Sequence, residues 1–249
     1  MYEYDFRVSF CQSDMQHRMT IPAIVDAFQD CSCFHSDDSG VGFDYLEPRS
    51  LVWVISYWEI EFLKVPMYGS RVTVGTFPYG FKSIMGYRNY YLKDDKGEYI
   101  VKANSVWVLM DWDKQCIVKP SDELINAYDL EDRLDMDYSN KRKVEIPKFD
   151  TNGYFYIDGT EAVICEEGRL TIQRHHLDSN GHVNNCQYIK IAADYADADE
   201  RYKKMYVEYR AQAHFGDEIN IKAFDSEKGR LIVLEDTEGN PYSVILFAV

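Results

Sequence analysis

The chain has 249 residues, enough for one large domain or two domains of ordinary size. Acidic residues outnumber basic ones by 42 to 27, and the formal net charge of -15 excludes general binding to nucleic acid phosphates. No apolar run approaches the roughly 20 residues that span a bilayer, and the first residues lack the pattern of a signal peptide. We therefore expect a cytoplasmic protein without a membrane segment.

The first half of the chain is predicted to form one helix followed by an antiparallel meander. Thr20 can cap a helix that runs to about Asp30, with apolar residues at helical spacing. Residues 51–110 then contain four strand-like runs, LVWVISYWEIEFL, RVTVGTF, SIMGYRNYYL and YIVKANSVWVLM. Turn residues at 68–69 and 94–97 separate these runs.

The middle of the chain differs in composition from both halves. Residues 131–162 are rich in charge, with Lys141-Arg142-Lys143 and Pro147, and show little apolar periodicity. We interpret them as a linker between an N-terminal domain, residues 1–130, and a C-terminal domain, residues 163–249.

The second half repeats the order of the first. RLTIQRH predicts a strand and residues 184–196 a helix, and the runs MYVEYRAQA, EINIKAF, RLIVLED and YSVILFAV predict strands. Residues 60–74 align with 207–221, and residues 14–19 align with 178–183, in the same order along the chain. A long helix followed by about four antiparallel strands is the element order of a hot-dog fold, in which the sheet wraps around the helix. The chain is therefore predicted to be an α+β tandem hot-dog.

The six cysteines give no sign of a metal site or of disulfides. They show no CxxC spacing, so zinc is not indicated, and we expect free, buried thiols. No cofactor is expected. The cysteines are Cys11, Cys31, Cys33, Cys116, Cys165 and Cys186.

Polar residues concentrate where a predicted strand ends and the second predicted helix begins. Asp178, Asn180 and His182 stand at alternate positions, so in an extended stretch their side chains would point to one side, beside the N–H groups of a helix start. The alternative is that Asp178, Asn180 and Asn184 are only turn and cap residues. A metal site at the histidines of residues 175–182 is improbable, because no carboxylate or cysteine of standard spacing accompanies them.

A carboxylate, an amide and an imidazole suffice for thioester hydrolysis, because a thiol with a pKa of about 8.5 leaves without strong acid help. Asp178 could act as a general base on water or attack the carbonyl carbon itself, and the sequence leaves both roles open. In either case His182 and a backbone N–H would polarise the carbonyl oxygen, and Asn180 would orient the reactants.

The segment LDSNGHVNNCQYI resembles the LDxNxHVNNxxYI signature of plant and bacterial acyl-acyl carrier protein (acyl-ACP) thioesterases. Residues 97–110 and Glu208-Tyr209-Arg210 are similar to two further motifs of that family. The resemblance implies a hydrolase that releases fatty acid from acyl carrier protein and ends chain elongation. It places the family's catalytic residues on Asp178, Asn180 and His182.

The chain departs from the plant members after Arg210, where Gln212 and Ala213 replace a glutamate and a cysteine. Gln212 stays a candidate catalytic residue because its amide can bind water, although it cannot take up a proton. Ala213 excludes a cysteine nucleophile at that position, and a mechanism using Cys186 with His182 is a poor second.

The first half carries Asp14, Gln16 and Arg18 in the equivalent places, so one active site per chain is expected. We expect the first half to supply the acyl-chain pocket, although core packing explains each candidate equally well. The candidates are Ile24, Phe28, Trp53 and Trp107.

The expected partner, acyl carrier protein bearing an acyl phosphopantetheine thioester, is itself acidic, so docking would need a local basic patch. The sequence offers residues 141–143, Lys203-Lys204 and Arg210, although charged runs are more often only solvated surface. Two alternatives stay open: an acyl-CoA thioesterase of the same fold, and a non-catalytic acyl-binding or carrier-binding module, which Gln212 favours. A homodimer is also left open.

Overall fold

A computed structural model of the chain describes residues 1–139, 142–150, 154–157, 159–196 and 202–249. The chain divides into two compact units, Met1–Tyr138 and Ser139–Val249, and each is described by itself. Among the described residues, no helix has the length and apolar character needed to cross a membrane.

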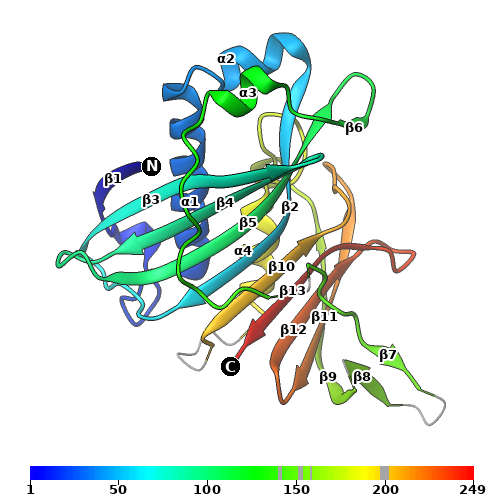
Figure 1. The fold of residues 1–249 in the computed structure, drawn as a ribbon. Helices are drawn as coiled ribbons and strands as arrows, with labels where there is room; N and C mark the ends of the chain where they lie inside the picture. Colours follow the sequence, from blue (N-terminus) through cyan, green and yellow to red (C-terminus); the bar gives the residue numbers. More distant parts are fainter. Residues whose placement is uncertain (140–141, 151–153, 158, 197–201) are drawn as a thin grey trace. The chain divides into compact units, whose positions relative to one another are not determined.

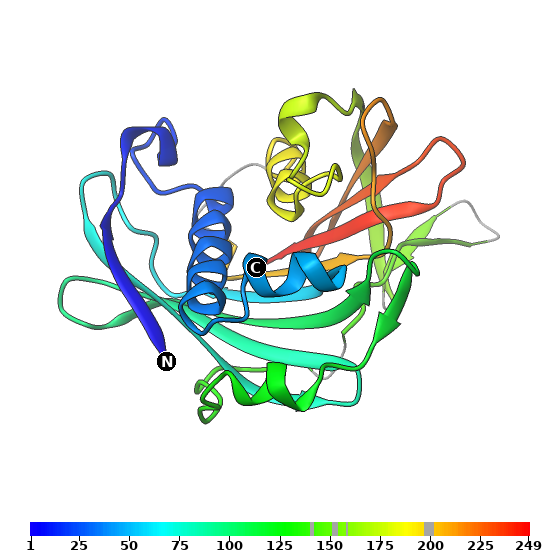
Figure 2. The same ribbon diagram turned by 90° about the horizontal axis from the view of Figure 1, so that it is seen from above.

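The first unit packs a long helix against an antiparallel sheet with the strand order β1-β3-β4-β5-β2, and a short strand, β6, pairs with β5 (Figure 1). Helix α1 lies against one face of this sheet (Figure 2). The strands are β1 (Tyr2–Arg7), β2 (Leu51–Phe62), β3 (Arg71–Lys82), β4 (Met85–Lys93), β5 (Tyr99–Asp111) and β6 (Cys116–Val118). The helices are α1 (Ile21–Asp38), α2 (Phe43–Leu46) and α3 (Asp122–Asn126), with 3-10 turns η1 (Phe10–Gln12) and η2 (Glu47–Arg49).

The second unit has the same plan with a shorter helix. Its strand order is β10-β13-β12-β11-β9-β8-β7, and α4 packs against β12 and β13. The strands are β7 (Lys148–Phe149), β8 (Phe155–Ile157), β9 (Thr160–Thr171), β10 (Lys204–Tyr209), β11 (Glu218–Ser226), β12 (Gly229–Glu235) and β13 (Pro241–Ala248). The helices are the 3-10 turn η3 (Arg174–His176) and α4 (Asn185–Ala193).

The two units repeat each other in topology and in register. Strand β1, helix α1 and strands β2 to β5 match β9, α4 and β10 to β13, both along the chain and across the sheet. Arg7 pairs with Arg71, and the aligned residues Thr171 and Glu218 also pair. The aligned glycines Gly69 and Gly216 both have positive φ, at 81° and 88°. The predicted α+β tandem hot-dog fold is therefore confirmed.

Helix α1 begins where the sequence predicts and ends later. The Thr20 hydroxyl accepts a hydrogen bond from the backbone N–H of Ala23 at 3.3 Å, which caps the first turn. The prediction of an end near Asp30 is wrong, because the helix continues to Asp38. Its last turns still face the sheet, and His35 is buried there although it is polar. The helical spacing of apolar residues therefore ends before the helix itself ends.

Several smaller elements were not predicted. Strands β7, β8 and the start of β9 lie inside residues 131–162, which we interpreted as a linker, and β1 precedes the first predicted helix. Most side chains of β9 are exposed or only partly covered, so this strand has no long apolar run to show in the sequence. All six cysteines are free, but the expectation that they are buried is wrong for Cys11, Cys116 and Cys165, which are exposed.

Candidate active site

The polar segment before α4 folds as a tight turn. The backbone N–H of Asp178 donates to the carbonyl oxygen of His182 at 2.8 Å, and the N–H of Gly181 donates to the carbonyl oxygen of Asp178 at 3.1 Å. The expected extended stretch with alternating side chains is therefore wrong, because the chain reverses direction here. Gly181 adopts φ 78° in this reversal without steric strain, whereas the equivalent His17 of the first unit adopts φ 62°.

The Asp178 carboxylate is held by the backbone of its own turn. Its Oδ1 accepts hydrogen bonds from the N–H of Asn180 at 2.8 Å and from the N–H of His182 at 3.2 Å. These hydrogen bonds are typical of a turn residue, which was the alternative interpretation of Asp178. Within the described part of the chain, no hydrogen bond to its Oδ2 is found, so the fixed carboxylate presents one oxygen that can accept a proton.

Asn180 and Asn184 have different surroundings. Asn180 is exposed at the tip of the turn. Asn184 caps α4, because its Oδ1 accepts a hydrogen bond from the N–H of Cys186 at 2.9 Å, so the cap interpretation holds for this residue. Cys186 itself is fully buried, and the alternative mechanism with a Cys186 nucleophile therefore has no accessible thiol.

His182 is buried, with 8% of its surface exposed, and its ring packs against His214. The ring centroids lie 4.8 Å apart with an interplanar angle of 72°, and the two residues form an isolated β-bridge. Burial lowers the pKa of His182, the nearby His214 lowers it further, and Asp178 only partly opposes these effects. The His182 imidazole is therefore neutral near neutral pH, and a neutral imidazole can donate one hydrogen bond.

The segment after β10 lies beside this turn. The N–H of Val183 donates to the carbonyl oxygen of Ala213 at 3.0 Å, and the N–H of Ala213 donates to the Tyr188 hydroxyl at 2.8 Å. Ala213 is fully buried, whereas Gln212, the remaining candidate catalytic residue, is exposed. Gln212 therefore directly precedes Ala213, whose carbonyl oxygen bonds the segment after the turn. Its side chain makes no hydrogen bond to the described residues.

Sequence reasoning missed His214 and Asp217. Asp217 Oδ2 lies 3.7 Å from His214 Nδ1, and it accepts hydrogen bonds from the His214 backbone N–H at 2.8 Å and from the Tyr242 hydroxyl at 3.3 Å. The alignment of the two halves contained a usable signal, because it sets His214 against Met67. A histidine that replaces an apolar residue beside the polar segment marks an added titratable group.

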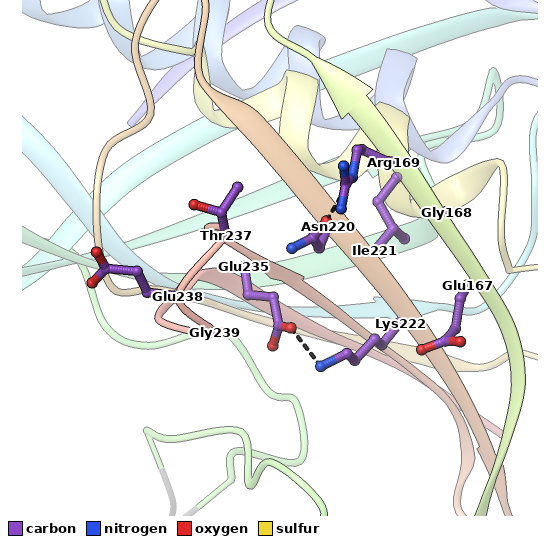
Figure 3. Close-up of a pocket in the computed structure, with 10 residues that line it drawn as sticks. All are labelled: Glu167, Gly168, Arg169, Asn220, Ile221, Lys222, Glu235, Thr237, Glu238 and Gly239. Atoms are coloured by element: carbon purple, nitrogen blue, oxygen red, sulfur yellow. Dashed lines mark hydrogen bonds and ion pairs between the residues drawn. The ribbon is translucent and has the colours of Figure 1, made fainter.

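Metal-binding side chains and one hollow were considered as alternatives to this turn among the described residues. Among the described residues, no group of three or more His, Cys, Asp or Glu side chains is arranged to hold a metal ion. A hollow of about 710 Å³ lies over β9, β11 and β12, and Asp178, Asn180 and His182 do not line it (Figure 3). Its lining is largely polar and includes the ion pair of Lys222 with Glu235, which does not suit a fatty acyl chain.

The candidates for the acyl pocket lie in or near the core of the first unit. Ile24 and Phe28 are fully buried, and the Phe28 ring centroid lies 5.4 Å from that of Tyr90. Trp53 and Trp107 are half-buried. These contacts show core packing and leave the pocket role a prediction.

Of the basic residues considered for carrier docking, Lys141 lies outside the described residues, and Arg142, Lys143 and Lys203 are exposed. Arg210 has a structural role, because its guanidinium donates to Glu208 at 2.7 Å and to the carbonyl oxygen of Val144 at 2.9 Å.

Comparison with known proteins gives a consistent result. The family model for the acyl-ACP thioesterase N-terminal domain matches residues 1–128, and that for the acyl-ACP thioesterase C-terminal domain matches residues 163–240. Oleoyl-acyl carrier protein thioesterases 1 and 2 of Arabidopsis thaliana, both chloroplastic, are 28% and 27% identical to 76% and 88% of the chain. The chain spans 52% and 61% of the lengths of these two relatives.

Solved structures show the same fold. An acyl-ACP thioesterase from Bacteroides thetaiotaomicron superimposes with a TM-score of 0.83 at 20% identity, over 99% of this chain and 96% of that one. A 12:0-ACP thioesterase from Umbellularia californica superimposes with a TM-score of 0.81 at 18% identity, over 98% and 95% of the two chains.

Proposed function

Because the chain belongs to the acyl-ACP thioesterase family, we propose that it hydrolyses fatty acyl thioesters of acyl carrier protein to free fatty acid and carrier thiol. The observation that carries this proposal is the turn at residues 178–182. It holds a carboxylate through one oxygen, and it sets a buried, neutral imidazole four residues away.

In the proposed reaction Asp178 acts as the general base. Water donates a proton to Asp178 Oδ2 while its oxygen bonds to the thioester carbonyl carbon, and the carbon–sulfur bond then breaks. The departing thiolate takes up the proton from Asp178, which restores the carboxylate, and the fatty acid loses its own proton to solvent. The two backbone hydrogen bonds to Oδ1 keep the carboxylate oriented, so little reorganisation is needed in the transition state.

His182 and Asn180 have supporting roles in this proposal. The neutral His182 ring donates a hydrogen bond to the carbonyl oxygen as negative charge develops there. The exposed Asn180 amide orients the water and the thioester. Gln212, exposed beside the turn, can bind the same water but cannot take its proton, so the proton must go to Asp178.

The decisive experiment is fatty acid release from a ladder of acyl carrier proteins with increasing acyl length. We expect the wild-type chain to release fatty acid from at least one carrier-bound substrate and to act more slowly on the matching acyl-CoA. Faster hydrolysis of acyl-CoA would favour the acyl-CoA thioesterase alternative. Tight acyl binding without release of free acid would favour the non-catalytic module.

A single turnover in heavy-oxygen water separates the two roles of Asp178. If Asp178 is the general base, the label enters the fatty acid directly and the protein stays unlabelled. If the carboxylate attacks the carbonyl carbon, an acyl-enzyme anhydride forms, and its hydrolysis can leave the label on Asp178. Mass spectrometry of the peptide that contains residues 178–182 therefore decides between the mechanisms.

We further propose that acyl carrier protein docks near the basic residues 141–143. Replacing all three with glutamate should raise KM for carrier-bound substrate, because repulsion between two acidic proteins is then no longer relieved locally. A simple acyl thioester without the carrier serves as the control, and its KM should not change. An equal loss with both substrates would contradict this docking site.

A further inference from the structure

The contact between His182 and His214 has no part in the reaction as described so far. His182 is almost fully buried, whereas the side chain of His214 is 59% exposed, and their ring centroids are only 4.8 Å apart. Two imidazoles at this distance, one of them shielded from water, cannot both carry a proton without strong repulsion. Protonation of one ring therefore opposes protonation of the other.

The two rings have different surroundings. His182 faces the Asp178 carboxylate of its own turn and His214 from the neighbouring segment. His214 is open to water and has the Asp217 carboxylate 3.7 Å from its Nδ1. On other elements, the hydroxyls of Tyr188 on α4 and Tyr242 on β13 lie beside the segment that carries His214. They bond the backbone of Ala213 and the side chain of Asp217, respectively, and both are neutral near neutral pH.

The first unit shows that the fold does not require this pair. The isolated bridge between His182 and His214 has an equivalent between Arg18 and Met67, and the backbone turn before it is the same. There the second position carries an apolar side chain that cannot titrate. The two histidines are therefore an addition to a turn that forms without them.

We propose that His214 is a positioning residue for the thioester hydrolysis proposed above, on which this inference rests. Its ring packs against the His182 imidazole, which holds that imidazole in place and opposes its protonation, so that His182 stays a neutral hydrogen-bond donor toward the thioester carbonyl. The Asp217 carboxylate, 3.7 Å from His214 Nδ1, helps to fix the position of the His214 ring. His214 acts through His182 and needs no contact with the substrate.

The test replaces His214 with phenylalanine, which keeps an aromatic ring and removes the titratable group. NMR titration of isotope-labelled histidine side chains should show the protonation midpoint of His182 rising by about 0.5 to 1 pH unit, because the repulsion is lost. The value of kcat should fall about 2- to 5-fold at pH 6 and much less at pH 8, where His182 is neutral in both proteins, with KM within about twofold. Asp217→Asn should give a smaller change in the ratio of kcat at pH 6 to kcat at pH 8.

His17→Asn is the matched control. His17 is exposed beside Tyr68 in the first unit and has φ 62°, a conformation that asparagine tolerates, so this variant should leave the His182 midpoint and the kcat ratio unchanged.

An unchanged His182 midpoint in His214→Phe would overturn the inference. A shifted midpoint with an unchanged ratio of kcat at the two pH values would overturn the positioning role. If the wild-type chain releases no fatty acid at any pH, the proposed hydrolase function is contradicted, and the titration still reports separately whether the two histidines are coupled.

Discussion

The turn at residues 14–18 in the first unit and the turn at residues 178–182 in the second share a backbone and differ in chemistry. Asp14 Oδ1 accepts hydrogen bonds from the N–H groups of Gln16 at 2.9 Å and Arg18 at 2.8 Å, as Asp178 Oδ1 does in its own turn. The backbone N–H of Asp14 also donates to the carbonyl oxygen of Arg18 at 2.8 Å. The aspartate is therefore a structural requirement of the turn in both units.

The difference lies at the other carboxylate oxygen. Arg18 Nε donates to Asp14 Oδ2 at 2.9 Å, so the first turn neutralises its own carboxylate. Burial would raise the pKa of Asp14, but the hydrogen bonds and the charge of Arg18 outweigh burial and lower it. In the second turn a histidine stands in place of Arg18, and a second histidine stands in place of Met67. The two turns therefore share a backbone scaffold and differ in the side chains that it carries.

The largest expected effect is the difference in activity between replacing Asp178 and replacing Asp14. Asp178→Asn keeps the Oδ1 acceptor for the turn but cannot take up a proton, so kcat for fatty acid release should fall by about 10³-fold with little change in melting temperature. Asp14→Asn should keep activity and lose about 0.5 kcal/mol of stability, because only its partly exposed pair with Arg18 is lost. Equal activity losses in the two variants would show that the comparison is wrong.

The next largest effect is expected when an arginine, the residue of the first turn, replaces His182 in the second turn. In His182→Arg, a permanently charged guanidinium should pair with Asp178 Oδ2, as Arg18 does with Asp14, and should lower kcat by at least about 100-fold. Circular dichroism checks that the variant is folded. The reciprocal Arg18→His should create no second site, because Met67 leaves that histidine without a partner imidazole; two active sites per chain would contradict this interpretation.

The buried histidine of the first unit should affect stability and leave catalysis unchanged. His35 Nδ1 lies 2.9 Å from Arg88 Nη1, and because arginine only donates, Nδ1 must be the unprotonated acceptor. Burial, followed by the charge of Arg88, lowers the pKa of His35 to about 4.

The unfolded chain therefore takes up a proton at His35 as pH falls below about 6.5, and the folded chain does not until about pH 4, so stability should fall across this range by about 2 kcal/mol. Urea unfolding at pH 7 and pH 4.5 measures this loss. His35→Gln should reduce the loss, whereas the exposed control His17→Asn should not. A loss of the same size in His35→Gln would assign it to other groups.

The smallest expected effect compares the glycines that follow the two bridges. Gly69→Ala and Gly216→Ala both place a side chain at positive φ, with no close contact to oppose it, so each should cost about 1 kcal/mol. Only Gly216→Ala should also lower kcat, by a few-fold, because Gly216 lies between His214 and Asp217 and the catalytic turn depends on that segment. Melting temperatures and kcat together check this; a kcat defect in Gly69→Ala would contradict it.

The sequence was sufficient to predict the tandem hot-dog architecture, because duplicated apolar alternation and matched turn residues such as Gly69 and Gly216 are local properties. It also predicted which residues the polar turn contains. It did not predict that residues 178–182 reverse direction, because an alternating polar pattern suits both a strand and a turn until Gly181 adopts positive φ. It missed the short strands β7 and β8, in which only Ile157 is buried, so that neither carries a strong apolar pattern.

What the sequence determined by itself was the repeated fold and the identity of Asp178, Asn180 and His182 as a candidate site, because residue types and their spacing are written directly in it. Only the tertiary structure decided that His214, distant in sequence, packs against His182 and that Asp217 lies beside it. The physical reason is that burial and charge proximity, which set the protonation state of an imidazole, are properties of neighbours in space.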